Sequence, residues 1–237
     1  MNSQTENIKK SINFRRRRAF LTGASGKIGL KILEILLDLN FEVFAHCSKN
    51  KEKIFDFLKN NPQHANSTYV FEMDFEQDLP EIPEDIDCLI NCAAFFEKGN
   101  LRNTNHLMKM AQMNSFFPAE LTSQLAKTAH CGNVINILDG NIYRFNKNYQ
   151  NYRISKLLLE EITKQSAVLF APLVRVNAIA LGMLETIETP SNTHAKQKEV
   201  LSAEISDNNI ALTIELLVSC ENLTGQIIYL DNGVHLL

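Results

Sequence analysis

The chain has 237 residues, a formal net charge of −3 and 45% hydrophobic residues. This length fits one large α/β domain or two small ones, with ample material for a core. The slightly acidic balance implies no general attraction to nucleic acid or to an anionic membrane. No apolar run reaches membrane-spanning length and no signal-peptide pattern follows the N-terminus. We therefore expect a cytoplasmic protein with no nucleic-acid or membrane partner.

The five cysteines are an odd number and include no C-x-x-C pair. This pattern suggests neither a disulfide framework nor a zinc site, so no metal is predicted. Thiols in the core of a protein from a reducing cytosol are the expected state.

Residues 1–16 are polar and basic and are predicted to form a flexible arm, which leaves residues 17–237 as a single domain. At the boundary between the arm and the domain, Arg15 to Arg18 form the only dense charge run of the sequence. We interpret the run as a solvated lead-in to the first strand. Contact with an anionic ligand or partner is the alternative.

A glycine-rich turn follows the first predicted strand, Ala19–Leu21. The turn runs from Thr22 to Gly29 in the pattern T-G-x-x-G-x-x-G and opens a helix with apolar residues at three- and four-residue steps. This succession of strand, glycine turn and helix is typical of dinucleotide binding. Backbone amides can approach the pyrophosphate there, and the helix N-terminus adds partial positive charge.

The end of the second predicted strand, residues 42–47, indicates which dinucleotide is bound. Domains that choose NAD place a carboxylate near this end to hold the ribose hydroxyls. Here His46, Ser48 and Lys49 occupy the end without an acid, and Lys27 stands in the glycine turn. A basic, hydroxyl-bearing end favours the extra phosphate of NADP. The alternative for Lys49 is an ordinary lead-in to the next helix.

A helix over residues 51–60 leads to a third strand over 68–74, which ends in Asp74. This carboxylate is placed to meet an adenine edge, or else to cap the following turn. The fourth strand, 87–94, ends in small residues that let backbone lie close to a cofactor. Two phenylalanines follow at the mouth of the expected cleft, either for core packing or for stacking on a ligand.

A helix is expected over residues 104–128, with Pro118 as the place for a bend. Asn114 lies inside this helix. An asparagine in mid-helix usually faces solvent or bonds locally, and this is the expectation from the residue alone.

The segment from Asn133 to Lys156 carries the strongest chemical signal. An apolar strand, Val134–Leu138, ends in Asp139, and a polar loop leads to a helix with Tyr152 in its first turn. Tyr152 and Lys156 then lie one turn apart on one face. The ammonium favours the phenolate and lowers the pKa of the tyrosine, which makes it a candidate acid. Asp139 is placed to orient a substrate or to pass on a proton.

The same spacing occurs at Tyr143 and Lys147, only four residues past Asp139. That segment has no helical periodicity, so we discard the pair. For Tyr152 alone, the competing interpretation is a surface tyrosine on an amphipathic helix.

The remaining segments complete an alternating pattern. Residues 173–180 form a strand that runs into Gly182, and residues 183–196 are polar and expected to be mobile. Helical patterns continue to about residue 219, and residues 226–230 form the last strand. Strands that alternate with helices predict a single-domain, Rossmann-type, doubly wound parallel sheet in three α/β/α layers.

From about residue 17 onward these segments resemble the short-chain dehydrogenase/reductase family. The matching motifs are Thr22-Gly23…Gly29, Asn91-Cys92-Ala93-Ala94, Asn114, Ile135-Asn136-Ile137-Leu138-Asp139, Tyr152…Lys156, Arg175-Val176-Asn177 and Leu223-Thr224-Gly225…Asp231-Asn232-Gly233. Within the family the chain looks like pteridine reductases and dihydromonapterin or dihydrofolate reductases. Asp139 replaces the usual catalytic serine, and Lys27 replaces a glycine. Phe96 matches an aromatic residue that stacks on the pterin, and Tyr149 a tyrosine near the substrate.

This resemblance implies NADPH-dependent reduction of a pterin. Lys156 then holds the nicotinamide ribose and acidifies Tyr152, which supplies the proton with Asp139, and Asn114 orders a water. The implied coenzyme contacts are Gly23, Ser25, Lys27, Ile28, Gly29, His46, Ser48, Lys49, Asp74, Asn91, Ala93, Lys156 and Gly182; the implied substrate contacts are Phe96, Tyr149 and Asp139. Family members commonly pair, which implies a homodimer or homotetramer.

The chain also departs from the family pattern, with Asn91-Cys-Ala-Ala for Asn-Asn-Ala-Gly, Leu181 for a proline and Asn232 for a glycine. Two alternatives follow. One is a general carbonyl or 3-oxoacyl-thioester reductase, against which Asp139 argues because serine supports the carbonyl oxygen in such enzymes. The other is a non-catalytic NADPH-binding sensor or scaffold, which the departures favour.

Overall fold

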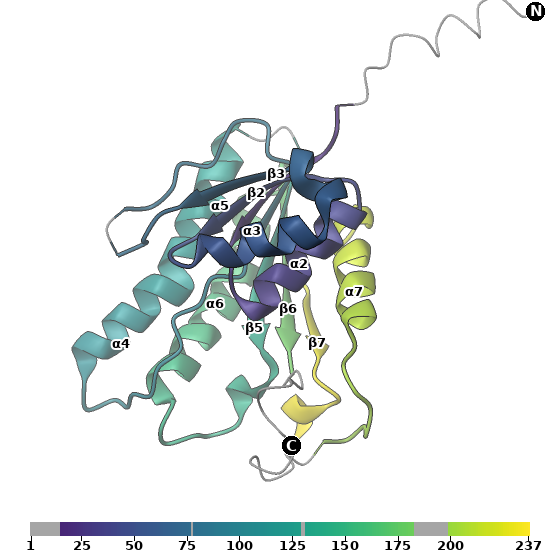
Figure 1. Ribbon diagram of the computed structural model, residues 1–237. Coiled ribbons are helices and arrows are strands. Elements are labelled where there is room, and N and C mark those ends of the chain that lie inside the picture. The colour runs from purple at the N-terminus through teal and green to yellow at the C-terminus, as the bar shows by residue number, and fades with distance from the viewer. Residues whose placement is uncertain (1–14, 77, 129–130, 183–198) are drawn as a thin grey trace, which may run out of the picture.

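The computed structural model describes residues 15–76, 78–128, 131–182 and 199–237. Its centre is a seven-stranded sheet in the order β3-β2-β1-β4-β5-β6-β7, in which every neighbouring pair is parallel (Figure 1). The strands are β1 (Arg18–Thr22), β2 (Glu42–Cys47), β3 (Thr68–Glu72), β4 (Cys88–Asn91), β5 (Gly132–Asp139), β6 (Val174–Leu181) and β7 (Ile227–Leu230).

Helices cover both faces of this sheet (Figure 1). One face carries α2 (Lys27–Asp38), α3 (Lys51–Asn60) and α7 (Asp207–Ser219); the other carries α4 (Thr104–Ala111), α5 (Phe117–Thr128) and α6 (Gln150–Leu169). The predicted doubly wound α/β/α fold is confirmed. Of the described helices, none is long and apolar enough to cross a bilayer.

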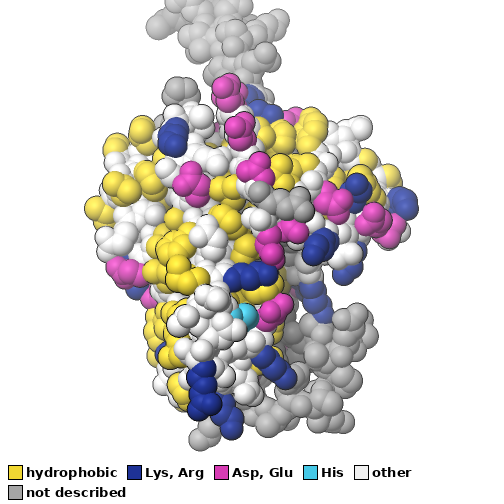
Figure 2. All heavy atoms as spheres, turned by 90° about the vertical axis from the view of Figure 1, so that its left-hand side faces the viewer, with side chains coloured by type: hydrophobic (Ala, Val, Ile, Leu, Met, Phe, Trp, Pro, Cys, Tyr) yellow, Lys and Arg dark blue, Asp and Glu magenta, His cyan; other side chains and the backbone are white. Residues whose placement is uncertain are grey.

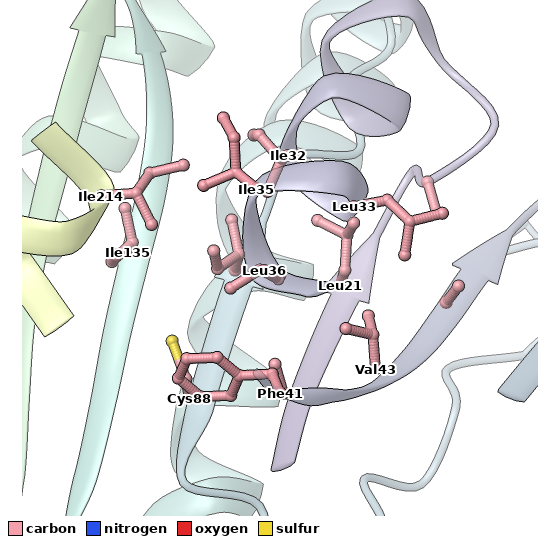
Figure 3. Packing of buried hydrophobic residues seen from close by; sticks show 14 of the residues in the cluster. Leu21, Ile32, Leu33, Ile35, Leu36, Phe41, Val43, Cys88, Ile135 and Ile214 are labelled. Carbon is pink, nitrogen blue, oxygen red and sulfur yellow. The ribbon is translucent and has the colours of Figure 1, made fainter. Parts of the chain in front are cut away.

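The packing under α2 shows why its sequence forms this layer. Ile32, Leu33 and Leu36 recur at helical spacing and are fully buried against the sheet, where Leu21 of β1 and Val43 of β2 meet them (Figure 3). Burial of each such side chain contributes about 1.5–3 kcal/mol. The helix is therefore held with its N-terminus at the carboxyl ends of the strands.

The helix expected over residues 104–128 is interrupted. A π turn over Gln112–Phe116 separates α4 from α5, whereas Pro118 lies in the first turn of α5, where its missing N–H costs little. The extra residue in the turn directs Asn114 inward, and its side chain is fully buried. The expectation of a solvent-facing or locally bonded asparagine is therefore wrong.

The second strand and the helix over residues 51–60 have the predicted bounds. The helix that ends near residue 219 begins only at Asp207, after a capping box formed by Ser206 and Asn209, and no helix occurs over 199–206. The segment expected to be mobile, 183–196, lies outside the described residues, as does the arm up to residue 14.

The arginine run lies at the amino ends of the strands. Arg15 Nη2 donates to Asp87 Oδ1 over 2.9 Å, and the guanidinium of Arg17 lies 4.4 Å from the centre of the Phe41 ring. These cations are thus bound to the chain's own acids and rings. They stand at the edge of the sheet opposite to the glycine turn.

Candidate active site

A cavity of about 620 Å³ opens at the carboxyl ends of the strands. Its walls come from the segments that follow β1 to β6, including the glycine turn after β1 and Cys92 to Phe95 after β4. The chain reverses its strand order between β1 and β4. Open α/β sheets bind ligands in the crevice at such a switch point, so this cavity is the candidate site.

The glycine turn forms a cradle with little room for side chains. Gly23 has a φ of +70°, and a Cβ atom on it would lie 2.7 Å from the Cα of Ala93. A Cβ atom on Gly29 would lie 2.1 Å from the carbonyl oxygen of Gly23. Gly26 caps α2 without a side-chain hydrogen bond, so the amides of the first turn remain available to a ligand. The cradle therefore fits the diphosphate of a dinucleotide.

Thr22 joins the glycine turn to the end of β4. Its buried Oγ1 accepts hydrogen bonds from the backbone N–H groups of Cys92 and Ala93, both over 3.0 Å. These bonds hold the small residues after β4 against the cradle. This segment lines the cavity, as the prediction that its backbone lies close to a cofactor requires.

The end of β2 is expected to be basic, but its histidine, His46, is neutral. Burial lowers the pKa of His46 to about 4, its Nε2 lies 2.9 Å from the carbonyl oxygen of Met73, and its ring stacks on Phe75. His46 lines the cavity as a neutral ring, so it adds no positive charge to the strand end that the sequence predicts to be basic. Lys49 lies at the rim, with a side chain that is 77% exposed.

Asp74 caps the turn after β3, which is one of the two roles predicted for it, and it also lines the cavity. Its Oδ1 accepts a hydrogen bond from the backbone N–H of Glu76 over 3.1 Å, which caps the turn after β3. The residue also lines the cavity, and its Oδ2 lies 4.0 Å from Lys49 Nζ. A capped carboxylate of this kind is held in place for a ligand without a rotamer change.

Asp139, Tyr152 and Lys156 meet in the wall of the cavity. Asp139 is the last residue of β5, and α6 presents the other two one turn apart. The hydroxyl of Tyr152 forms a hydrogen bond with the Asp139 carboxylate. Lys156 is buried, and its Nζ donates to the carbonyl oxygen of Ile137 over 2.8 Å. A phenol, a carboxylate and an ammonium are thus assembled at one point.

The prediction that Lys156 lowers the pKa of Tyr152 is wrong for this arrangement. Burial raises the pKa of Tyr152 well above its ordinary value, and the charge of Asp139 and its hydrogen bond raise it further. Burial also lowers the pKa of Lys156, to about 8. A dry wall disfavours both charged forms. Tyr152 is therefore a protonated phenol at neutral pH, which is the state that an acid needs.

Asn114 lies behind this cluster. Its Oδ1 accepts from the backbone N–H of Phe95 over 2.7 Å, and its Nδ2 donates to the Phe95 carbonyl and to Ser155 Oγ, both over 2.9 Å. The side chain thus connects the segment after β4 with the helix that carries Tyr152. It lies outside the residues that line the cavity.

An aromatic group stands beside Tyr152. The ring of Phe96 packs edge-on against Tyr152, with centres 4.7 Å apart, and stacks on Tyr149 at 4.8 Å and an angle of 7°. Phe96 remains 59% exposed. Phe96 and Tyr149, two of the three residues predicted to contact the substrate, are thus brought together next to Tyr152.

Most predicted coenzyme contacts also lie in the cavity wall: Gly23, Ser25, Lys27, Ile28, Gly29, His46, Ser48, Lys49, Asp74, Ala93, Lys156 and Gly182. Asn91 does not. Its buried Nδ2 donates to Asn136 Oδ1 over 2.8 Å, which places the side chain within the sheet. The discarded Tyr143 lies away from the cavity and donates to Glu160 Oε2 over 2.5 Å.

Sequence reasoning did not single out Asn141, Met113 and Cys92 as parts of the wall. The backbone N–H of Asn141 donates to Asp139 Oδ1 over 2.7 Å, and the D-x-N spacing after a strand was an available signal for this turn. Met113 lines the cavity because it lies in the π turn, which the periodicity of the sequence does not predict. Burial raises the pKa of Cys92 to about 12, so its thiol is neutral.

Comparison with known proteins agrees with this architecture. A family described as enoyl-(acyl carrier protein) reductase, one of the short-chain dehydrogenase/reductases, matches residues 75–235. No curated protein matches the chain.

Many solved structures share its fold, among them two dihydrofolate reductases. The FolM alternative dihydrofolate reductase 1 from Brucella canis, complexed with NADP, superposes with a TM-score of 0.81 at 24% identity over 93% of this chain and 94% of its own. The Brucella suis protein of that name, also in complex with NADP, has the same TM-score and identity over 93% of this chain and 96% of its own. With the family match over most of its length, the chain belongs to the short-chain dehydrogenase/reductase family.

Proposed function

We propose that the protein is an NADPH-dependent reductase that acts on a pterin ring. The observation that carries the proposal is the assembly of Asp139, Tyr152 and Lys156 in the wall of a cavity that also contains the glycine cradle. Two proteins of the same fold that are described as dihydrofolate reductases complexed with NADP support it.

The residues of the cavity suit each part of the coenzyme. The glycine cradle would hold the diphosphate, and Asp74 would meet the adenine. Lys27 and Lys49 are both exposed at the rim and would take the extra phosphate of NADPH, since His46 is neutral. Lys156 would donate to the nicotinamide ribose. When bound, the coenzyme supplies the hydride.

The residues of the chain then provide the proton and the orientation. Reduction of a C=N bond adds a hydride to carbon and a proton to nitrogen. Tyr152 is held protonated beside Asp139, so it can donate that proton and recover one through the carboxylate. Phe96 offers an exposed aromatic face next to the Tyr152 hydroxyl, which suits a flat heterocycle.

The experiment is a substrate panel with the purified protein. NADPH oxidation is measured in parallel with dihydrobiopterin, dihydromonapterin and dihydrofolate, and with a 3-oxoacyl thioester. We expect turnover with at least one dihydropterin or dihydrofolate. Turnover with the thioester alone would replace the proposal by the carbonyl-reductase function. NADPH binding without turnover of any substrate would favour a sensor.

A further inference from the structure

Four cations without a partner among the described residues lie in the two chain segments that carry the aromatic group. They are Lys98, Arg102, Lys147 and Arg153, and we call them the basic rim. None of the four side chains forms an ion pair or a hydrogen bond with another residue in the described part of the chain. Cations on a protein surface are ordinarily interspersed with acids, so an unpaired set next to a cavity is a candidate contact for an anion.

Two segments of the chain carry the basic rim, and backbone contacts join them. Gly99 pairs with Tyr149 in a parallel bridge, and its N–H donates to the carbonyl oxygen of Asn148 over 2.8 Å. Lys98 and Lys147 each precede one partner of that hydrogen bond, so they belong to the same junction. The backbone N–H of Leu101 donates to Gln150 Oε1 over 3.3 Å, which brings the backbone next to Arg102 to the first turn of α6.

Arg153 adds a buried donor to this surface. Its Nε is enclosed by the described residues and has no hydrogen-bond partner among them. An enclosed guanidinium N–H without an acceptor is unfavourable and is relieved by an oxygen ligand. The neighbouring acid Glu97 is directed towards His106, with its Oε2 3.5 Å from His106 Nε2, and forms no ion pair with any of the four cations among the described residues.

The charge distribution on the surface agrees with this reading. Lys and Arg side chains gather at the lower end of the face shown in Figure 2, towards which the strands of Figure 1 point, and Asp and Glu side chains lie mainly above them. The described parts of α4 and α6 begin at this end. On this face, cationic side chains therefore gather at the end of the molecule where the strands have their carboxyl ends.

The rim continues directly from the proposed ring site. Phe96 stands two residues before Lys98, and Tyr149 two residues after Lys147. Tyr152 precedes Arg153 and touches Phe96. A ring bound beside Tyr152 and Phe96 would therefore extend any substituent across the basic rim.

We propose that the basic rim binds an anionic tail on the substrate, made of carboxylate or phosphate groups attached to the ring. This inference rests on the proposed function and specifies its substrate class. The protein then prefers a dihydropterin that carries such a tail over one that does not. The preference comes from Coulomb attraction at exposed sites, so added salt weakens it.

The test compares substrates with one ring and different tails. Values of kcat/KM are measured for tail-less dihydrobiopterin, for dihydrofolate with one and with several glutamates, and for a phosphate ester of a dihydropterin, at low and high salt. Lys98→Gln/Lys147→Gln should lower kcat/KM for the tailed substrates by about tenfold at low salt and leave dihydrobiopterin unchanged. The tail that responds, carboxylate or phosphate, identifies the anionic group.

A matched control removes the same charge elsewhere. Lys59→Gln/Lys127→Gln alters two lysines in the last turns of α3 and α5 and should change none of these values. Equal losses for tailed and tail-less substrates, or no loss for either, would overturn the inference while leaving the reductase function intact. If the wild-type protein reduces no dihydropterin, the proposed function fails. In that case calorimetry compares the binding affinities of the tailed and the tail-less ligands, and tighter binding of the tailed ligand would still support the basic rim.

Discussion

Asn114 Nδ2 donates a hydrogen bond to Ser155 Oγ over 2.9 Å, and this bond ties the π turn to the helical turn between Tyr152 and Lys156. Ser155 Oγ in turn donates to the carbonyl oxygen of Tyr152 over 2.7 Å. Ser115 Oγ donates to the carbonyl oxygen of Ser155 over 2.6 Å. The side chains of Asn114, Ser115 and Ser155 are buried, so α6 is fixed where it presents Tyr152 to the cavity.

Ser155 is therefore expected to be a positioning residue. In Ser155→Ala, Asn114 loses an acceptor in a dry site, and we expect the free energy of unfolding to fall by about 1–3 kcal/mol. Because the Tyr152 hydroxyl is less well oriented, kcat should fall by roughly tenfold while the KM for NADPH stays unchanged. Ser166→Ala, at another buried serine of α6, is the control and should keep kcat. A Ser155→Ala protein with the kcat of the wild type would show that the hydrogen bonds of Ser155 contribute to stability alone.

Tyr152→Phe should bind NADPH with unchanged affinity and lose turnover by at least about a hundredfold, because general acid catalysis contributes on this scale. Coenzyme fluorescence measures the binding and NADPH oxidation the turnover. The chain supplies its own matched variant, Tyr143→Phe, at the other tyrosine with a lysine four residues later. That change breaks a hydrogen bond to Glu160, so it should cost stability and spare turnover. Similar turnover in the two variants would remove Tyr152 from the mechanism.

Lys156 is expected to trade stability for function. Burial lowers its pKa from 10.5 to about 8, so between these values the unfolded chain binds a proton that the folded chain has lost. The free energy of unfolding should then rise with pH across this interval, and the buried charge should cost stability below pH 8. Lys156→Met should raise the free energy of unfolding at pH 7 by about 1–3 kcal/mol, remove that rise, and weaken coenzyme binding.

Urea unfolding of the wild type and Lys156→Met between pH 7 and pH 10 measures both effects. Lys156→Arg keeps the charge at every pH of the series and serves as the control. A wild-type stability that is flat over this range would contradict the lowered pKa.

Lys49 should contribute to the choice of coenzyme. It lines the cavity and is exposed, whereas Lys51 pairs with Glu72 over 3.3 Å. We expect Lys49→Gln to raise the KM for NADPH by about tenfold at low salt and to leave the KM for NADH unchanged. Lys51→Gln is the matched control and should alter neither value by much. Equal changes for the two coenzymes would mean that Lys49 does not meet the extra phosphate.

Sequence reasoning predicted the layers and most elements because local periodicity and tertiary packing agree in this chain. The apolar steps of α2 and the apolar run of β5 are the same residues that become buried. The glycine turn could be predicted for a similar reason. At Gly23 and Gly29, backbone atoms lie so close that a Cβ atom would clash with them, so only glycine fits. Site residues at the ends of strands could therefore be placed in one cleft before the structure was described.

The failures have one physical source. The inward turn of Asn114, the neutral ring of His46 and the raised pKa of Tyr152 all depend on partners or burial supplied by distant segments. Spacing along the chain carries no information on desolvation, and desolvation dominates each of these groups.

The order of residues by itself determined that strands and helices alternate, that a glycine cradle follows the first strand, and that a tyrosine and a lysine share one face of a helix. Those are consequences of backbone periodicity and of the absence of Cβ atoms, which are local properties. Only the tertiary structure decided that the phenol stays protonated beside a carboxylate and that a cationic surface adjoins it. Charge states depend on the dielectric and on the neighbours in space, and both come into being only when the sheet is assembled.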